Sequence, residues 1–368
     1  MKYLFIILDG VQDISYPELA GKTPLEAGWG EGLERFERES AFVTLSTTPP
    51  GMEADTLNCV LTLLGLEAPL IPSGRSYLES LAEDIFVGEE DIILRCSFVE
   101  VDGNGVVKDP CCTPPADIAA AIMRAVAKKH GEALRRVGPY KCMQVLEGVK
   151  DELEGLVTHA AHGCKGLIYE EALPSGNKLA DALAETGREL LKAFAPYTVI
   201  YWAPSRREEL PSFTELTGLR GGFVQKTSLL GGIARLMEMP SPQVPGATGE
   251  CDTNLLGKAQ AALSLLSSCD MAVVHVGGAD EATHRQSPEE KAGFIARVDK
   301  ELLLPIMRDC PDGCKILLTS DHEALCSTAG HTDAPVGGRL WEKGRTHGGD
   351  LGLLNGREAI SLLTGGEW

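Results

Sequence analysis

The sequence lacks the features that would place the protein in a membrane or in a secretory pathway. None of its uncharged runs approaches the roughly 18 residues that a membrane-spanning helix needs. The apolar run at the N-terminus is short and closed by Asp9, with no small-residue cleavage site after it, which is not the pattern of a secretory leader. No internal repeat and no low-complexity segment interrupts the chain. We therefore expect a soluble protein with no membrane partner.

Disulfide frameworks and zinc-type cysteine pairs are also absent. The eleven cysteines form no Cys-x-x-Cys pair. The adjacent Cys111 and Cys112 cannot easily serve a regular disulfide framework, because the geometry of a disulfide is narrow. We expect reduced thiols and a cytoplasmic location.

Positive charge is scarce, with 34 Lys and Arg against 53 Asp and Glu and a formal net charge of −19. Nucleic acids and anionic membranes do not attract a surface of this sign, so we expect neither as a partner. To bind an anionic substrate, the protein would need positive charge at the binding site itself, such as metal ions and a few arginines. The 368 residues, 43% hydrophobic and 24% charged, are sufficient for one large globular domain and a smaller one.

Three strand-like apolar runs end in residues that can bind metal ions. Continuous apolar runs are typical of buried parallel strands, and in open α/β sheets the site lies outside the carboxyl ends of the strands. Any one of these residues could simply be an N-cap aspartate or a surface histidine. That explanation would have to hold separately for five residues, Asp9, Asp280, His284, Asp321 and His322, so a shared metal site is the better account. Asp280 and His284 are four apart and would share a helix face. The candidates are Asp9 after 3–8, Asp280 and His284 after 272–276, and Asp321 and His322 after 315–320, with His331 nine residues beyond.

The pattern along the chain predicts an α/β protein with an insertion. From residue 219 onward, strand-like and helix-like segments alternate, which favours a mostly parallel sheet flanked by helices. Residues 76–205 instead mix helices with hairpins, including a turn at 102–105. Capping boxes at Thr23 and Ser287 predict helices from 23 to about 38 and from 287 to 307. We predict a discontinuous core, 1–75 plus 206–368, and an inserted smaller α+β domain, 76–205.

A hydroxyl residue stands at the predicted start of another helix. Leucines at helical spacing predict a helix from Thr56 to Leu64, and Gly65 is a natural stop. Free N–H groups and the helix dipole favour a phosphate at this end, so the Thr56 hydroxyl is a candidate nucleophile. The alternative is that Thr56 is simply an N-cap, and the two roles are compatible.

Ordered motifs along nearly the whole chain resemble one known family. The segments are FIILDG with KTPLEAG, SGRSYLESLA, RCSFV, VPGATG with DTN and GKA, HVGGADEATH, TSDHEA and GHTDAPVGG. In that order they resemble the cofactor-independent phosphoglycerate mutases of the archaeal type, which belong to the alkaline phosphatase superfamily. The resemblance implies an alkaline-phosphatase-like α/β core interrupted by a substrate-binding cap, and chemistry that needs no 2,3-bisphosphoglycerate.

The resemblance also implies roles for particular residues. Two divalent metal ions, Mn²⁺, Zn²⁺, Co²⁺ or Mg²⁺, would assist catalysis, and Lys258 would lie near the transferring phosphoryl group. Arg75 and Arg95 match positions in and around the cap, where a planar guanidinium suits a carboxylate or phosphate; a surface ion pair is the alternative. The implied metal ligands are Asp280, His284 and His331 for one ion and Asp9, Thr56, Asp321 and His322 for the other.

The chain departs from this family at the nucleophile and in the cap. The family has serine followed by aspartate, whereas Thr56 is followed by Leu57. An Asp-rich run of the family's cap corresponds to residues 158–162, where two acids are missing and His162 is the substrate-binding candidate. A glycine- and proline-rich stretch corresponds to 202–207, which contributes Arg206. The metal motifs are kept while the cap is altered.

We expect a phosphomutase that interconverts 2- and 3-phosphoglycerate, or a closely related small phosphorylated acid, through a phosphothreonine. The alternatives are a metal-dependent phosphohydrolase, a mutase for another small phosphometabolite, or a non-catalytic protein that binds such a metabolite. The sequence also allows a homo-oligomer.

Overall fold

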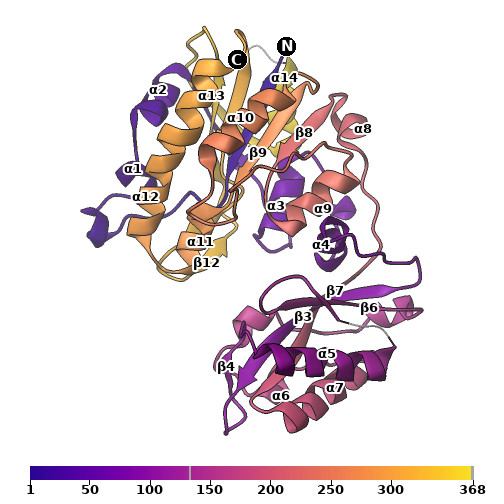
Figure 1. The fold of residues 1–368 in the computed structure, drawn as a ribbon. Helices are drawn as coiled ribbons and strands as arrows, with labels where there is room; N and C mark the ends of the chain where they lie inside the picture. The colour runs from indigo at the N-terminus through magenta and orange to yellow at the C-terminus, as the bar shows by residue number, and fades with distance from the viewer. Residues whose placement is uncertain (132–133, 366–368) are drawn as a thin grey trace. The chain divides into compact units, whose positions relative to one another are not determined.

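The computed structural model describes residues 1–131 and 134–365, which form two compact units. The larger unit contains Met1–Ile71 and the chain from Leu210 onward, and the smaller unit is Pro72–Glu209 (Figure 1). Within the described residues, no helix is long and apolar enough to cross a membrane.

A seven-stranded sheet forms the centre of the larger unit. Its strand order is β14-β2-β13-β10-β1-β9-β8, and β13 runs antiparallel to both of its neighbours while the remaining pairs are parallel. The predicted α/β class with a mostly parallel sheet is therefore confirmed. The strands are β1 (Tyr3–Leu8), β2 (Ala41–Ser46), β8 (Gly221–Val224), β9 (Met271–Val276), β10 (Lys315–Thr319), β13 (Val336–Glu342) and β14 (Asp350–Asn355).

Strand β1 is buried along its whole length between β9 and β10. On one face Leu4, Ile6 and Leu8 join a core that includes residues of α10 (Leu255–Leu265), α12 (Pro288–Val298) and α13 (Leu304–Asp309). On the opposite face, the Tyr3 hydroxyl donates a hydrogen bond to the Thr364 carbonyl oxygen in α14 (Gly356–Gly365). Helices thus cover both faces, as the apolar runs indicated.

The helix expected from residue 23 to about 38 is divided in two. The Thr23 capping box is present, but α1 (Pro24–Ala27) ends after four residues and α2 (Glu31–Glu39) begins anew. The break falls at two glycines, Gly28 as the C-cap of α1 and Gly30 as the N-cap of α2, and both are packed too closely for a side chain: a Cβ on Gly28 would collide with the Ala292 carbonyl oxygen of α12, and one on Gly30 with the Asp299 carboxylate. The single long helix was therefore wrong.

The helix expected at 287–307 is present with an irregular middle. Ser287 caps α12 through the Glu290 N–H, and a π-helical turn at Asp299–Leu303 joins α12 to α13. Single π-helical turns inside a helix often mark positions with a specific structural or functional task. Here Asp299, the first residue of the turn, accepts hydrogen bonds from the Gly32 and Leu33 N–H groups in the first turn of α2. The other helices of this unit are α3 (Thr56–Leu63), α8 (Phe213–Thr217), α9 (Ser228–Leu236) and α11 (Gly278–His284).

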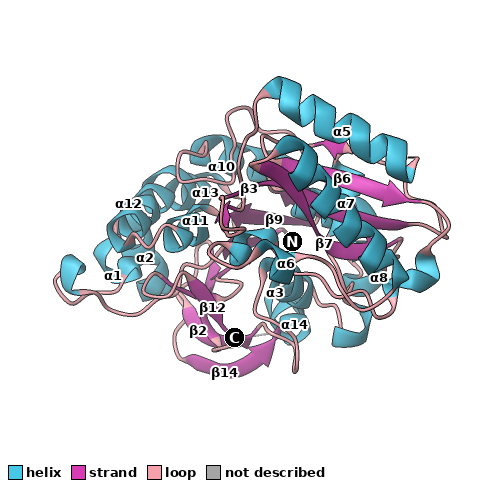
Figure 2. Ribbon diagram, turned by 90° about the horizontal axis from the view of Figure 1, so that it is seen from below, coloured by secondary structure: helices cyan, strands magenta, loops and turns pink. Residues whose placement is uncertain are grey.

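The smaller unit has an α+β architecture. Its sheet has the order β4-β3-β6-β5, and β7 also pairs with β3. One face is packed with apolar residues of α5 and α7, which lie side by side in Figure 2. The elements are α4 (Ser76–Ala82), β3 (Ile92–Val101), β4 (Val107–Asp109), α5 (Ala116–His130), β5 (Arg135–Arg136), β6 (Lys141–Leu146), α6 (Tyr169–Ala172), α7 (Lys178–Phe194) and β7 (Tyr197–Arg206).

Candidate metal centre

The ends of β1, β9 and β10 bring the candidate metal ligands of the larger unit together. In the parallel register Leu8 lies beside Val276, and Ile7 lies beside Thr319. Asp9, the residue directly after β1, is held by its N–H, which donates to the Val276 carbonyl oxygen at 3.0 Å. The Gly10 N–H donates to Asp321 Oδ1 at 3.1 Å. The carboxylates that follow β1 and β10 therefore face one another at the carboxyl edge of the sheet.

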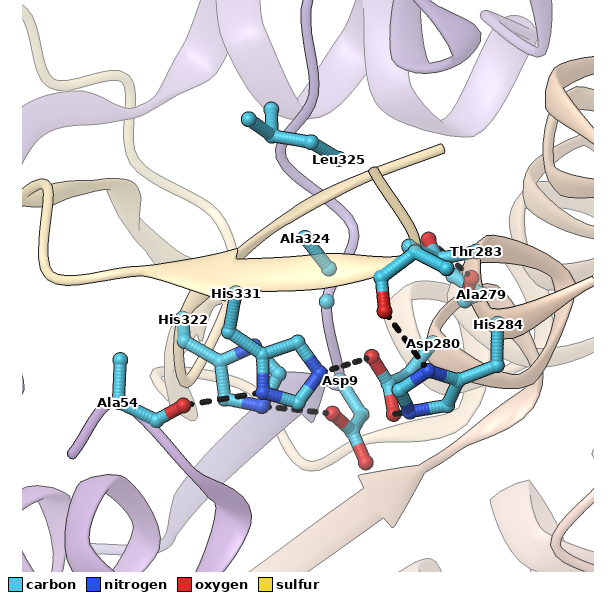
Figure 3. A network of polar contacts seen from close by, with 12 residues as sticks. Asp9, Ala54, Ala279, Asp280, Thr283, His284, His322, Ala324, Leu325 and His331 are labelled. Carbon is cyan, nitrogen blue, oxygen red and sulfur yellow. Dashed lines mark hydrogen bonds and ion pairs between the residues drawn. The ribbon is translucent and has the colours of Figure 1, made fainter. Parts of the chain in front are cut away.

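Asp280 is the centre of the first group of side chains (Figure 3). His284 lies one turn further along α11, and its Nε2 is 3.1 Å from Asp280 Oδ2. His331 comes from the separate strand β12 (Gly330–Thr332), and its Nε2 is 3.0 Å from Asp280 Oδ1. The His331 Nδ1 contacts the Ala54 carbonyl oxygen at 2.9 Å, which fixes the orientation of the ring. Helix α11 therefore places Asp280 and His284 on one face, as their spacing predicted.

The second group consists of Asp9, Asp321 and His322. The His322 Nε2 lies 3.4 Å from both Asp9 Oδ1 and Asp321 Oδ2, without the geometry of a hydrogen bond. These three atoms are buried, and within residues 1–131 and 134–365 none of them has a hydrogen-bond partner. Unpaired buried polar atoms are costly, so their convergence at one place indicates a missing partner of positive charge.

The two groups meet at His322. His322 belongs to two groups of three potential metal ligands, one with Asp9 and Asp321 and the other with Asp280 and His331. Within each group, one potential ligand atom from every residue lies within 4.8 Å of the other two. The His322 and His331 rings stack with their centroids 3.9 Å apart. His284 contacts Asp280 and is not part of either three-residue group. All six acid and histidine residues named from the sequence are thus linked in one cluster.

The electrostatics of the cluster favour a bound cation. Burial, together with the Asp321 and Asp280 carboxylates, raises the pKa of Asp9 well above its usual range. Burial acts in the same direction on Asp280, but hydrogen bonds from His284 and His331 outweigh it and hold that pKa well below the usual range. The hydrogen bond to Asp280 in turn raises the pKa of His284 to about 9. Carboxylates this close together are stable in their charged form when a cation compensates them.

Thr56 and Lys258 lie near this cluster in different ways. Thr56 is the first residue of α3, but the N-cap is Asp55, whose side chain accepts the Asn58 N–H at 2.8 Å. The simple N-cap role for Thr56 is therefore wrong. Its hydroxyl has no hydrogen-bond partner among the described residues, and it lies two residues after Ala54, which contacts His331. Lys258 is 1% exposed in α10.

His275 is a polar residue of this region that the sequence patterns did not single out. It interrupts the apolar strand β9, is 2% exposed, and its Nε2 lies 3.3 Å from Asp9 Oδ2. Its backbone oxygen accepts a hydrogen bond from Lys258 Nζ at 3.0 Å. Burial lowers the pKa of His275 to about 4, so the imidazole is neutral at pH 7. The signal was present, since a histidine inside an otherwise apolar buried strand needs a polar partner.

Comparison with known proteins gives the family. The model of a family described as the Metalloenzyme superfamily matches residues 1–358. The chain belongs to the Metalloenzyme superfamily. Curated relatives include the 2,3-bisphosphoglycerate-independent phosphoglycerate mutase of Methanothrix thermoacetophila, 27% identical with all of both chains covered. The enzyme of the same name from Methanopyrus kandleri is 29% identical, over 92% of this chain and 87% of the relative.

Solved structures share the fold of this member of the Metalloenzyme superfamily. A protein from Pyrococcus horikoshii has a TM-score of 0.74 and 20% identity, covering 98% of this chain and 96% of its own. The cofactor-independent phosphoglycerate mutase from Thermoplasma acidophilum has a TM-score of 0.60 and 18% identity, with 99% of each chain covered. The shared fold therefore extends over both compact units.

The residues of the cluster suit the divalent metals that the Metalloenzyme superfamily implies. Carboxylate oxygens and imidazole nitrogens are the donors preferred by Mn²⁺, Zn²⁺ and Co²⁺ in mixed sites. The unpaired atoms of Asp9, Asp321 and His322 point to one such ion. His331 meets a condition typical of metal-binding histidines, because its second ring nitrogen is held by a carbonyl oxygen.

The smaller unit brings together three of the four substrate-binding candidates. Glu79 holds both arginines: its carboxylate is 2.6 Å from Arg75 Nε and 3.0 Å from Arg95 Nε. The Arg95 guanidinium also lies 4.2 Å from the ring centre of Trp202. The His162 ring meets the same indole edge-on, at 5.5 Å between centroids.

Arg206, the fourth candidate, is separate from this group. Arg95 pairs with Trp202 across β3 and β7, whereas Arg206 pairs with Ile92 near the end of the same ladder, and its Nε is 4.0 Å from a Glu208 oxygen. Glu79 and Trp202 were missed by the sequence reasoning. A glutamate four residues after Arg75 in a helix was the available signal for Glu79.

Proposed function

We propose that the protein is a phosphoglycerate mutase that uses two divalent metal ions and no bisphosphoglycerate. The observation that carries this proposal is the cluster of buried, unpaired acid and histidine atoms at the carboxyl edge of the sheet. The curated relatives that match over nearly the whole chain carry the name of this activity. Asp9, Asp321 and His322 would hold one ion, and Asp280, His284 and His331 the other, with His322 close to both.

Bound metal ions would neutralise charge on the phosphoryl oxygens and make a hydroxyl easier to deprotonate. The protein's own residues would supply the nucleophile and the positioning. Thr56 would attack the phosphorus through Oγ1, at a helix end where free N–H groups favour a phosphate. The phosphoryl–oxygen bond of the substrate breaks as the new bond forms. The proton lost by Thr56 ends on the glycerate oxygen that leaves, and the freed glycerate then takes the group back on its other oxygen, whose proton returns to Thr56.

Lys258 would stabilise charge on the transferring group. Its ammonium is buried at the end of β9, and burial, together with repulsion from Lys226, lowers its pKa to about 8. At pH 7 it therefore remains mostly charged. Among the described residues the Lys258 ammonium has one hydrogen-bond partner, the His275 carbonyl oxygen, so it has donors left for a phosphoryl oxygen.

The Arg75, Glu79 and Arg95 group is proposed to bind the carboxylate of the substrate. Arg95 is 7% exposed and is held from two sides by Glu79 and the Trp202 ring, so its guanidinium is fixed before the ligand arrives. A fixed planar guanidinium binds a carboxylate through two parallel hydrogen bonds at a small entropic cost.

One experiment distinguishes the proposed mutase from other phosphoryl-transfer functions. The protein is incubated with 3-phosphoglycerate and Mn²⁺, and the products are followed by phosphorus NMR. Accumulation of 2-phosphoglycerate supports the proposal. Release of inorganic phosphate alone would indicate a phosphohydrolase instead, and an unchanged spectrum, with Mn²⁺ binding demonstrated separately, would indicate a protein that only binds the metabolite.

A further inference from the structure

A buried ion pair lies directly behind the histidine-bearing part of the metal centre. Lys291 of α12 and Asp13 of the loop after β1 have fully buried side chains, and Lys291 Nζ is 2.8 Å from Asp13 Oδ2. Neither residue belongs to the acid and histidine cluster. Burying the two charges costs about as much free energy as their attraction returns, so the pair by itself adds little to the stability of the fold.

Lys291 also holds the β-hairpin that carries the metal-centre histidines. This hairpin consists of β11 (Glu323–Leu325) and β12, with His322 just before β11 and His331 in β12, paired with Ala324. Lys291 Nζ donates to the Ala324 carbonyl oxygen at 2.7 Å. The Ala324 N–H donates to the Gln12 carbonyl oxygen at 3.0 Å. The N–H and the carbonyl group of Ala324, the residue paired with His331, are therefore both held by residues outside the hairpin.

Asp13 holds the next residues of the same hairpin. Its Oδ2 accepts the Cys326 N–H at 3.3 Å, and its Oδ1 accepts the Tyr16 hydroxyl at 2.7 Å. The Tyr16 oxygen in turn accepts the Ser327 N–H at 3.0 Å. Burial alone would raise the pKa of Asp13, but hydrogen bonds from Lys291 and Tyr16 outweigh it and hold the pKa below the usual range. The carboxylate is therefore charged at neutral pH.

Other contacts also hold the hairpin: the Gln12 side chain donates to Glu323 Oε1, the Gln286 side chain donates to the Ser327 carbonyl oxygen, and a His284 ring nitrogen contacts the Ala329 carbonyl oxygen. Its two strands form a sheet of their own, separate from the seven-stranded sheet. The hydrogen bonds of Asp13, Lys291 and Tyr16 therefore connect it to the loop after β1, which follows Asp9, and to α12, which follows α11 and its Asp280. We propose that the Asp13–Lys291 pair, with Tyr16, positions His322 and His331 relative to Asp9 and Asp280, and so determines the metal affinity.

This inference rests on the proposed metal centre, and its test measures binding rather than turnover. Mn²⁺ is titrated calorimetrically into metal-free wild-type protein and into Asp13→Asn, which keeps the shape of the side chain but removes its charge. Loss of a group that orients metal ligands typically weakens metal binding about 10–100-fold, and we expect a loss of this size. Tyr16→Phe, which removes one hydroxyl and leaves the ion pair, is the milder variant and should weaken binding less than Asp13→Asn.

Asp299→Asn is the matched control. Asp299 is 3% exposed and also accepts backbone N–H groups, those of Gly32 and Leu33, but it holds α2 instead of the hairpin. It should keep the wild-type Mn²⁺ affinity. A second measurement without metal is amide hydrogen exchange, where Asp13→Asn should accelerate exchange at Ala324, Cys326 and Ser327, and Asp299→Asn should not.

The outcomes separate this inference from the proposed function. Wild-type Mn²⁺ affinity in folded Asp13→Asn and Tyr16→Phe would overturn the positioning role, even if the wild-type protein is an active mutase. An equal loss in Asp299→Asn would also overturn it, because general destabilisation would then be the cause. A wild-type protein that binds no divalent ion would refute the metal centre and the positioning role together. A protein that binds Mn²⁺ as described but forms no 2-phosphoglycerate would refute the mutase alone.

Discussion

Replacing Lys258 with methionine should make the metal-free protein more stable and at the same time inactive. Lys258 is 1% exposed, and its ammonium donates a hydrogen bond to the His275 carbonyl oxygen at 3.0 Å. Burial is the main cause that lowers its pKa to about 8, from an ordinary value of 10.5. Methionine has a similar length and shape but carries no charge. The substitution therefore tests what the buried charge costs.

The expected gain follows from the pKa. A difference of one pKa unit corresponds to about 1.4 kcal/mol, so at pH 7 the charge of Lys258 costs the folded state about 3 kcal/mol. The lost hydrogen bond to His275 offsets about 1 kcal/mol of this. The free energy of unfolding of Lys258→Met should exceed that of the wild type by about 2 kcal/mol at pH 7.

The gain should depend on pH in a definite direction. The pKa of Lys258 is lower in the folded state, so below about pH 8 both states are protonated and the full cost is present. Between pH 8 and 10.5 the folded chain loses this proton while the unfolded chain keeps it, and the wild type regains stability. The advantage of Lys258→Met should therefore shrink over this window.

Urea unfolding of the metal-free proteins at pH 7.0 and pH 9.5 measures both effects. Lys22→Met removes an exposed lysine of the same unit that does not act on Lys258, and it is the control, whose unfolding free energy should change by less than about 0.5 kcal/mol. The reasoning is refuted if Lys258→Met is less stable than the wild type at pH 7, or if the difference between them is the same at both pH values.

Three further predictions concern the proposed reaction. Thr56→Ser should retain substantial mutase activity and Thr56→Ala should lose most of it while still binding Mn²⁺; intact-mass analysis during turnover should find one phosphate on wild-type protein, and near wild-type turnover by Thr56→Ala would exclude the covalent route. Arg95→Lys should raise the KM for 3-phosphoglycerate several-fold, because an ammonium cannot make the two parallel hydrogen bonds, whereas unchanged kinetics would remove Arg95 from the site. Mn²⁺ at 100 times its dissociation constant should raise the free energy of unfolding by about 2.7 kcal/mol, a gain that EDTA reverses, and no effect of Mn²⁺ on unfolding would argue against the metal centre.

The parts of the site that could be predicted from sequence are those governed by local pattern. The apolar runs of β1, β9 and β10 lead into Asp9, Asp280 and Asp321, and the structure brings these carboxylates together at one sheet edge. The i, i+4 spacing placed His284 beside Asp280. These inferences needed only the period of a strand or a helix and the rule for the carboxyl edge of parallel strands.

The parts that could not be predicted depend on contacts distant in the sequence. The break between α1 and α2 falls at Gly28 and Gly30, and glycine is a helix-ending residue that the sequence shows, but the close approach of Ala292 and Asp299 to these two glycines is not visible in it. The role of Glu79 depends on a buried arginine of another element, Arg95. The role of Asp13 could not be predicted for the same reason, because its partner Lys291 is separated from it by most of the chain.

Strand β1 has a consequence for the order in which the protein can fold during its synthesis. It is made long before its two neighbours, which contain Met271 and Lys315 and pair with Tyr3 through these residues. At about 5–20 residues per second, a ribosome needs on the order of tens of seconds to reach them. During that interval an entirely apolar strand has no permanent partner on either edge, and such edges readily pair with other chains. The unit Pro72–Glu209 contains all the strands of its own sheet and can complete that sheet first. We therefore expect the nascent chain to depend on chaperones chiefly for strand β1.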